Sequence, residues 1–313
     1  GHGSMLLYSL LHLNGFPLSM DEIKNFRQLN SKTAGHPEVD TSIGIDTTTG
    51  PLGQGFANGV GFAVAERYLA SLLGEDVINH FTFGIVSDGD LMEGISFEAA
   101  ELAAVWKLGK IIYLFDDNNI SIDGSVDKVS ITNQKEKFES IGWHVLEIDG
   151  HNEKEIIKSV EKGRKVEDKP TLIIAKSTIG KFAPNKENTS GVHGSPLGSD
   201  EMNKFLMNLD WSGDPFLHSD DIYDYFKEKR EKDNEELRKW EENFKNKYQE
   251  NPSFKDNWDL LTSEDFPSFD GVNGEKYASR ILGSKILEDL SESTNSIIGG
   301  SADLAASTKQ IID

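Results

Sequence analysis

Residues 81–124 contain two short apolar runs separated by a helical pattern, and this arrangement limits the folds that the chain can adopt. The runs at 81–86 and 110–115 are rich in aromatic and β-branched residues and have the length of buried strands. The spacing from about 96 to 108 is helical. Two strands joined through a helix form a βαβ unit, whose strands are parallel and whose crossover is almost always right-handed. The stretch therefore predicts a parallel sheet covered by helices.

Each of these two runs ends in a polar cluster. Ser87-Asp88-Gly89-Asp90 follows the first run, and Asp116-Asp117-Asn118-Asn119 follows the second. Open α/β sheets bind ligands at the carboxyl ends of their parallel strands, so we expect Asp88 and Asn118 to face one crevice. A carboxylate and an amide oxygen suit a hard divalent cation, and Gly89 lets a backbone approach a phosphate closely. The alternative is that both clusters are ordinary turns.

Strand and helix patterns alternate through most of the chain. The sequence predicts a doubly wound parallel sheet with helices on both faces, an α/β fold. A long irregular loop is expected at 30–55, and loops of that length inside a compact domain are usually functional. The other elements expected in this part are helices at 4–13, from Ser19 or Asp21 to Leu29, at 54–73, 132–141 and 152–166, and strands at 143–148 and 171–176.

The last third of the chain changes in composition. A highly charged helix is expected from about 219 to 248, and we interpret 251–273 as a linker. A new αβ unit is expected from near Gly274, with a helix through Leu290 and a strand at 296–300. We therefore predict a first domain at 1–250 and the start of a second at 274–313.

Net charge, cysteine content and hydropathy exclude several classes of function. A formal net charge of −21 argues against binding to the nucleic acid backbone. The chain has no Cys, which excludes disulfides and cysteine catalysis and fits a reducing cytoplasm. No apolar run has the length of a membrane span, and no signal peptide is present, so we expect neither membrane association nor secretion.

The two strand-end clusters and five further motifs together resemble the transketolase family. The resemblance runs in family order over nearly the whole chain. It implies the thiamine diphosphate (ThDP) binding fold, with Mg²⁺ or Ca²⁺ as the metal. The further motifs are His2-Gly3-Ser4-Met5-Leu6-Leu7-Tyr8, Gly35-His36-Pro37-Glu38, Thr47-Thr48-Thr49-Gly50-Pro51-Leu52-Gly53-Gln54-Gly55, Leu91-Met92-Glu93-Gly94 and Gly300-Ser301-Ala302-Asp303-Leu304-Ala305.

Family resemblance also implies roles for individual residues. The metal ligands would be Asp88, Asn118 and the backbone carbonyl of Ile120. ThDP would contact Gly89, His2, His193, Asp303 and the segment Gly50-Pro51-Leu52. His36 and His193 would bind the sugar and handle protons, and Arg280 and Ser307 would bind its phosphate. The family usually has Gly where this chain has Ser87, and we expect a negative φ there, which Ser adopts without strain.

The reaction implied is reversible transfer of a two-carbon ketol group between sugar phosphates, in a homodimer whose active site lies at the subunit interface. The chain starts inside one motif and ends just after another. We therefore expect a fragment with little activity alone, because the family's activating glutamate would lie beyond Asp313. Two alternatives stay open: a dihydroxyacetone synthase and a non-catalytic module with the same fold. Deoxyxylulose-phosphate synthase fits the loop motifs less well.

Overall fold

The computed structural model describes residues 3–263 and 276–309. The described residues form two compact units: unit 1 comprises 3–68 and 79–234, and unit 2 comprises 69–78, 235–263 and 276–309. The predicted domain boundaries at 250 and 273 stay a prediction.

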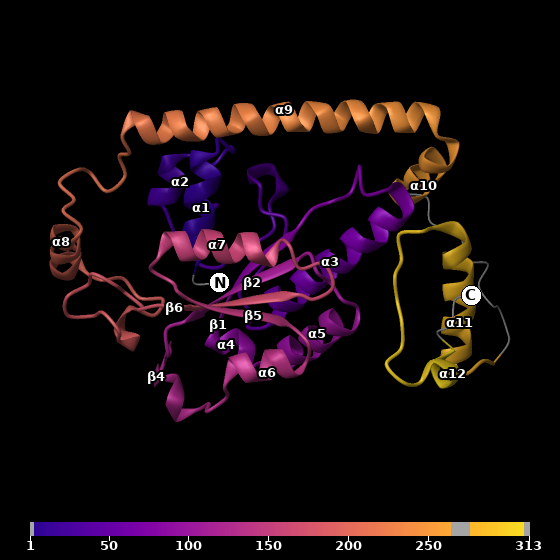
Figure 1. Cartoon of the computed structure of the whole chain (residues 1–313), viewed down its shortest axis with the longest axis horizontal. Coiled ribbons are helices and arrows are strands. Elements are labelled where there is room, and N and C mark those ends of the chain that lie inside the picture. The colour runs from indigo at the N-terminus through magenta and orange to yellow at the C-terminus, as the bar shows by residue number, and fades with distance from the viewer. Residues whose placement is uncertain (1–2, 264–275, 310–313) are drawn as a thin grey trace. The chain divides into compact units, whose positions relative to one another are not determined.

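A parallel sheet of four strands lies at the centre of unit 1, in the order β1-β2-β6-β5 (Figure 1). These strands are β1 (Thr82–Ser87), β2 (Ile111–Asp117), β5 (His144–Asp149) and β6 (Thr171–Lys176). The central strand β2 is almost wholly buried because β1 and β6 flank it and helices cover it. The predicted strands are confirmed, with shifts of one or two residues at their ends.

Helices cover both faces of the sheet, as the α/β prediction requires. One face packs against α3 (Gln54–Leu73), α4 (Asp88–Met92), α5 (Gly94–Val105) and α6 (Gln134–Ser140). The other face packs against α7 (Glu153–Gly163), where Gly163 lies against Ile112 of β2. The remaining elements of unit 1 are α1 (Ser4–Leu13), α2 (Met20–Lys24), the hairpin strands β3 (Ile120–Ser121) and β4 (Gly124–Ser125), α8 (Ser199–Asn208), and short 3₁₀ turns at Thr41–Ile43, Val126–Lys128 and Ser190–Val192.

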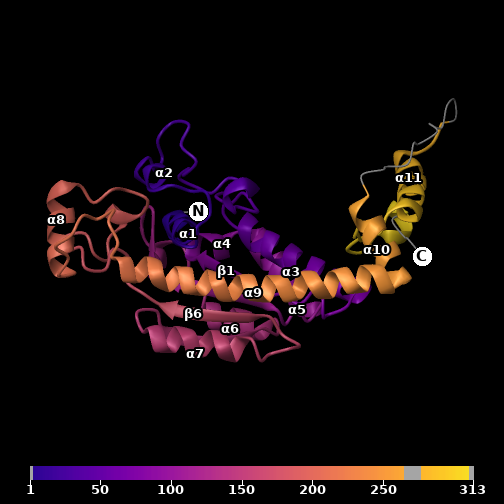
Figure 2. The same ribbon diagram turned by 90° about the horizontal axis from the view of Figure 1, so that it is seen from above.

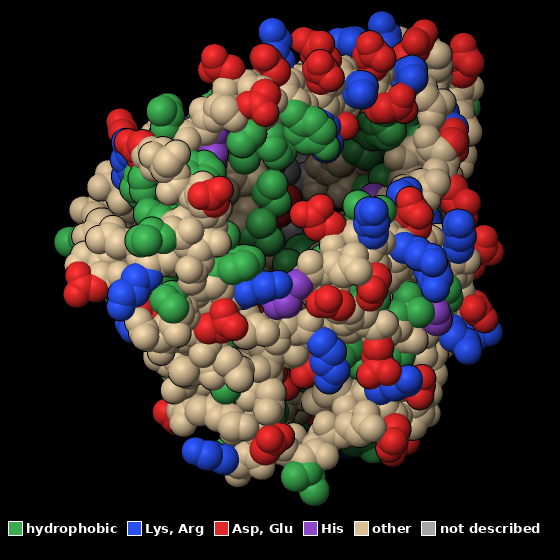
Figure 3. Space-filling model, turned by 60° about the vertical axis from the view of Figure 1, so that its left-hand side comes forward, with side chains coloured by type: hydrophobic (Ala, Val, Ile, Leu, Met, Phe, Trp, Pro, Cys, Tyr) green, Lys and Arg blue, Asp and Glu red, His purple; other side chains and the backbone are tan. Residues whose placement is uncertain are grey.

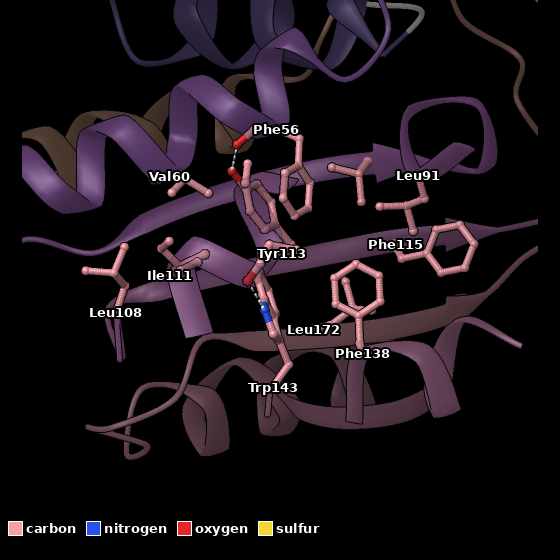
Figure 4. Close-up of a cluster of buried hydrophobic side chains, with 14 of the residues drawn as sticks. Phe56, Val60, Leu91, Leu108, Ile111, Tyr113, Phe115, Phe138, Trp143 and Leu172 are labelled. Atoms are coloured by element: carbon pink, nitrogen blue, oxygen red, sulfur yellow. Dashed lines mark hydrogen bonds between the residues drawn. The ribbon is translucent and has the colours of Figure 1, made fainter. Parts of the chain in front are cut away.

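Tyr113 is the centre of the main core. Its ring stacks on Phe56 of α3 at 4.5 Å between centroids and on Trp143 at 6.1 Å (Figure 4). Its hydroxyl donates a hydrogen bond of 2.6 Å to the carbonyl of Phe56, so the buried phenol is satisfied. A Cβ on Gly59 would lie 2.1 Å from this hydroxyl, and one on Gly84 would lie 2.2 Å from the ring. Close packing of helix on sheet thus explains Gly59 in the middle of α3.

The stretch that we interpret as a linker, 251–273, begins with a helix in the structure. Residues Pro252–Thr262 form helix α10, whose first turn is capped by the side chain of Asn251. Phe254 of α10 is 3% exposed and packs edge-on against Phe244 in the last part of α9 (Asp220–Glu250). Trp240 of α9 also donates a hydrogen bond of 2.8 Å from its indole nitrogen to the carbonyl of Val77. Figure 2 shows α9 as one unbroken helix.

The rest of unit 2 holds α11 (Ser279–Ser293) and α12 (Ala305–Thr308). The expected strand at 296–300 does not form, because this segment pairs with no other strand among the described residues. The expected start of the αβ unit near Gly274 lies outside the described residues. Within 3–263 and 276–309, no helix combines the length and the apolarity needed to cross a bilayer.

Candidate functional site

The carboxyl ends of β1 and β2 lie side by side. In the parallel register Ser87 is the partner of Asp116, and the polar residues that follow both strands emerge at one edge of the sheet. The Asp-Gly pair begins helix α4 directly after β1, so it is the first turn of a helix and not a free turn. Strand β2 extends through Asp117 because its pairing with β6 continues to Lys176. The two predicted clusters are therefore brought together.

Asp88 occupies a buried and strongly acidic position. The residue is only 8% exposed to solvent. Burial and then repulsion from Asp117 and Asp116 raise the pKa of Asp88 to about 6, although Lys176 opposes this rise. Lys176 pairs with Asp117. A cation at this position would offset the surplus of negative charge, so the donors present fit a divalent metal.

Asn118 is held in place by two hydrogen bonds. Its Nδ2 donates to Asp116 at 2.8 Å, and its Oδ1 accepts from the backbone N–H of Ile120 at 2.9 Å. Asn119 follows with a φ of +59°, which turns the chain into the β3–β4 hairpin. In the described part of the chain no three His, Asp or Glu side chains are arranged to hold a metal ion. The predicted metal ligands are of a different kind, because they combine the carboxylate of Asp88, the amide of Asn118 and the backbone carbonyl of Ile120.

The loop before α3 lies against the Asp88-Gly89 turn. A Cβ on Gly89 would be 3.3 Å from Leu52, so Gly89 allows the leucine side chain to approach the backbone. A Cβ on Gly50 would be 2.9 Å from Nδ1 of His36, and Gly50 has a φ of +146°. The loop that contains Gly50 and Leu52 therefore contacts His36 through Gly50 and Gly89 through Leu52. Pro51 lies between two of them and is exposed.

Helix α1 fixes the segment that carries His36. The Ser4 hydroxyl donates to the carbonyl of Gly35 at 2.9 Å, and the Tyr8 hydroxyl donates to that of Ala34 at 2.8 Å. Burial and the nearby Glu38 raise the pKa of Tyr8, which therefore stays a neutral donor. His2 lies outside the described residues.

Arg27 links the His36 segment to the His193 segment. Its Nη1 donates to the carbonyl of Gly194 at 3.0 Å. Its Nε lies 3.0 Å from the position that a Cβ on Gly35 would take. No motif indicates this role, because Arg27 binds a backbone carbonyl that lies 167 positions away in the sequence. His193 itself ends the short turn Ser190–Val192.

A cavity of about 510 Å³ opens beside Asp88 at the ends of β2, β5 and β6. Its wall is largely polar and includes both members of the Asp117–Lys176 pair. Figure 3 shows one side of the molecular surface, on which acidic and basic side chains are interspersed. The cavity is lined by Asp88, Phe115, Asp117, Asn119, Val126, Asp127, Ser130, Ile131, Thr132, Asn133, Gln134, Lys135, Glu147, Ile174 and Lys176.

Ser87 adopts the conformation that the sequence predicted. Its φ is −120° and its ψ 173°, which is extended backbone that any residue adopts. Its hydroxyl and its N–H both donate to the carboxylate of Asp90, at 2.9 and 3.0 Å. Replacement of the family's usual Gly therefore introduces no strain and adds a hydrogen bond.

The three remaining predicted residues lie in unit 2. Arg280 is in the first turn of α11, Asp303 precedes α12, and Ser307 is within it. The backbone N–H of Ser307 donates to the carbonyl of Leu304 at 2.8 Å. The functions of these three residues stay predictions.

Comparison with known proteins shows which family the chain resembles. Residues 1–267 match the family model described as transketolase, thiamine diphosphate binding domain. The transketolase of Bacillus subtilis is 43% identical over all of this chain and 49% of its own length. Transketolase 1 of Escherichia coli is 43% identical over 98% of this chain and 48% of its own length.

Solved structures agree. The crystal structure of transketolase from Campylobacter jejuni superimposes with a TM-score of 0.89 at 40% identity, over 99% of this chain and 48% of that one. A Pichia stipitis transketolase in complex with sedoheptulose 7-phosphate gives a TM-score of 0.88 at 34% identity, over 97% and 47%. The chain thus spans about half the length of the relatives it matches. Because the family model covers residues 1–267, this chain belongs to the transketolase family and includes its thiamine diphosphate binding domain.

Proposed function

We propose that the protein is a transketolase, which transfers a two-carbon ketol group reversibly from a ketose phosphate to an aldose phosphate. The donors would be xylulose 5-phosphate or sedoheptulose 7-phosphate, and the acceptors ribose 5-phosphate or glyceraldehyde 3-phosphate. One observation carries the proposal: the loop with Gly50 and Leu52 packs on the Asp88-Gly89 turn, beside the strand end that bears Asn118. This is one continuous surface made from the motifs that characterise the family.

Asp88, Asn118 and the carbonyl of Ile120 would hold Mg²⁺ or Ca²⁺. The position of Asp88 supports this, because its carboxylate is buried near two other acids and a cation relieves the repulsion. Gly89 lacks a Cβ, so the Leu52 side chain approaches its backbone closely, and main-chain donors of the same turn would bind the diphosphate. When bound, ThDP supplies an electron sink for cleavage of the bond next to the ketose carbonyl.

The loop and the histidines would orient cofactor and sugar. Leu52 offers an apolar side chain, and Gly50-Pro51 offers backbone groups, for contact with the cofactor rings. His36 packs against Gly50 and would hydrogen-bond sugar hydroxyls and move protons, since imidazole both donates and accepts near neutral pH. His193 would contact both the diphosphate and the sugar.

We propose roles in binding cofactor or substrate for residues near both ends of the chain as well. His2 would contact the diphosphate, and Asp303 would lie near the cofactor rings. Arg280 and Ser307 would hold the substrate phosphate through charge-assisted hydrogen bonds. Homodimeric assembly with the active site at the interface, and a cytoplasmic location, belong to the same proposal.

A two-acceptor assay on the full-length protein tests the function. With ThDP and Mg²⁺, xylulose 5-phosphate plus ribose 5-phosphate should yield sedoheptulose 7-phosphate and glyceraldehyde 3-phosphate. Activity with formaldehyde as acceptor, and none with ribose 5-phosphate, would instead identify a dihydroxyacetone synthase.

Calorimetric titration of ThDP with Mg²⁺ separates the enzyme from a non-catalytic module. Asp88→Asn should abolish measurable binding, whereas Glu101→Gln, which changes an exposed carboxylate on α5, should leave it unchanged. Failure of the unmodified protein to bind ThDP would refute the proposal.

A further inference from the structure

Asp90 joins two segments that the proposed function places around the cofactor. Its Oδ2 accepts hydrogen bonds from the N–H and the hydroxyl of Ser87, at 3.0 and 2.9 Å. Its Oδ1 accepts from the N–H of Gly53 at 3.2 Å. Gly53 belongs to the loop of Gly50 and Leu52, and Ser87 immediately precedes Asp88. One carboxylate therefore connects the loop to the end of strand β1.

The backbone of Asp90 is itself fixed. The hydroxyl of Ser96 in α5 donates to the carbonyl of Asp90 at 2.5 Å. Gly53 is packed closely on the start of the same helix, where its Cβ position lies 2.8 Å from Cβ of Glu93 and 2.9 Å from Oγ of Ser96. Its φ of +76° requires a glycine. The Asp90 carboxylate thus lies between two rigid partners.

Asp90 also provides charge that helix α3 lacks. The first turn of α3 contains no acidic residue, although the N-terminus of a helix favours a nearby anion. Gly53 directly precedes this helix, so its bond to Asp90 brings a carboxylate to the helix start from a different part of the chain. The interaction therefore stabilises the start of α3 and the position of the loop together.

We propose that Asp90, with Ser87 as its partner, is a positioning residue that holds Leu52 against Gly89. We call the hydrogen bonds that Asp90 accepts from Ser87 and Gly53 the bridge. The inference rests on the proposed function, since it assigns this bridge a purpose in cofactor binding. Leu52 precedes Gly53 and Gly89 precedes Asp90, so the contact of 3.3 Å between the Leu52 side chain and the Cβ position of Gly89 lies directly beside the bridge. Ser87 adds a hydrogen bond that the family's usual Gly does not supply.

Amide hydrogen exchange in the cofactor-free, full-length protein tests the bridge itself. In Asp90→Ala the N–H groups of Gly53 and Ser87 lose their acceptor, and their exchange should accelerate at least about tenfold. Exchange in the middle of α5 should not change. Glu101→Ala, which removes an exposed carboxylate from α5, is the matched control and should exchange like the unmodified protein. Unchanged exchange at Gly53 in Asp90→Ala would overturn the inference.

Calorimetric titration with ThDP and Mg²⁺ tests its purpose. Loss of a residue that orients metal-site groups typically costs about 10- to 100-fold in affinity, and we expect this for Asp90→Ala. Ser87→Gly should weaken binding by about threefold, and it should have no further effect when Asp90 is already Ala. A residue that serves only general stability would lower the free energy of unfolding and leave the ThDP affinity unchanged, and that result would overturn the inference.

Two outcomes separate this inference from the proposed function. If the unmodified protein binds no ThDP, the proposed function fails, whereas the exchange result still decides whether the bridge exists. If Asp90→Ala binds ThDP as tightly as the unmodified protein, only the positioning role fails. Should Asp90→Ala not fold, Asp90→Asn replaces it. Asn retains one acceptor oxygen, so it should weaken binding less and accelerate exchange at only one of the two N–H groups.

Discussion

Asp88→Asn should stabilise the metal-free protein at neutral pH. The carboxylate of Asp88 ionises with a pKa of about 6 instead of its ordinary 3.8, because it is buried and faces Asp117 and Asp116. This displacement corresponds to about 3 kcal/mol at pH 7, as an order of magnitude. Asn has similar size and carries no charge, so the metal-free variant should be up to about 3 kcal/mol more stable than the unmodified protein.

The sign of the effect fixes its pH dependence. A raised pKa means that the folded protein binds this proton more tightly than the unfolded chain. Ionisation of Asp88 therefore lowers the free energy of unfolding as the pH rises from about 4 to about 6, and the loss is complete above that range. The difference between Asp88→Asn and the unmodified protein should be close to zero below pH 4 and largest at pH 7.

Urea denaturation between pH 4 and pH 7.5, in the presence of a chelator, measures this difference. Asp123→Asn, which changes an exposed carboxylate in the β3–β4 turn, is the control and should show no such pH dependence. Addition of Mg²⁺ and ThDP should stabilise the unmodified protein and not Asp88→Asn. A variant that is less stable than the unmodified protein at pH 7, or a difference that does not vary with pH, would refute the reasoning.

Four further substitutions test the packing, three of them in unit 1 and Phe254→Ala in unit 2. Gly53→Ala should lower the free energy of unfolding by at least about 2 kcal/mol, because φ is +76° and the new Cβ overlaps α5. Gly61→Ala, on the exposed face of α3, is the control and should raise the free energy of unfolding by up to about 1 kcal/mol in the same urea titration. Tyr113→Phe should cost about 1–2 kcal/mol through its lost hydrogen bond, measured by thermal unfolding, with ThDP affinity unchanged. Phe254→Ala should cost about 3–5 kcal/mol and make Trp258, which packs in the same cluster, more accessible to a fluorescence quencher; an unchanged transition would contradict the buried packing of α10.

The sheet was predictable because its signals are local. Apolar runs and the helical patterns between them define parallel strands, and strands of this kind end at one edge. For this reason the convergence of Asp88 and Asn118 followed from the sequence alone. The extension of β2 through Asp117 did not, because two carboxylates interrupt the apolar run and only the pairing with β6 keeps them in the strand.

The last part of the chain was less predictable, for two different reasons. The polar segment with Pro252 is interpreted as a linker, although Asn251 followed by Pro is also a helix start signal. The expected strand at 296–300 is apolar enough, but a strand needs a partner, and the described residues provide none. Pairing between strands cannot be predicted from local sequence patterns. It determines both where the strands end and whether residues 296–300 form a strand.

Within the site, the sequence predicted side chains and missed the groups that position them. Arg27 and Asp90 act on the backbone of Gly194 and Gly53, which lie 167 and 37 positions away. Backbone N–H and carbonyl groups are present at nearly every position of a chain, so no motif marks the contact. Ser87 was noticed as a departure from the family, yet its bond to Asp90 became apparent only in the structure.

A crystal structure of the full-length protein with ThDP and Mn²⁺, recorded at an anomalous wavelength, tests the central claim most directly. The account predicts one strong anomalous peak at about 2.0–2.4 Å from oxygens of Asp88, Asn118 and the Ile120 carbonyl, with the diphosphate as a further ligand. A manganese ion bound elsewhere, or ThDP bound away from these two strand ends, would contradict it.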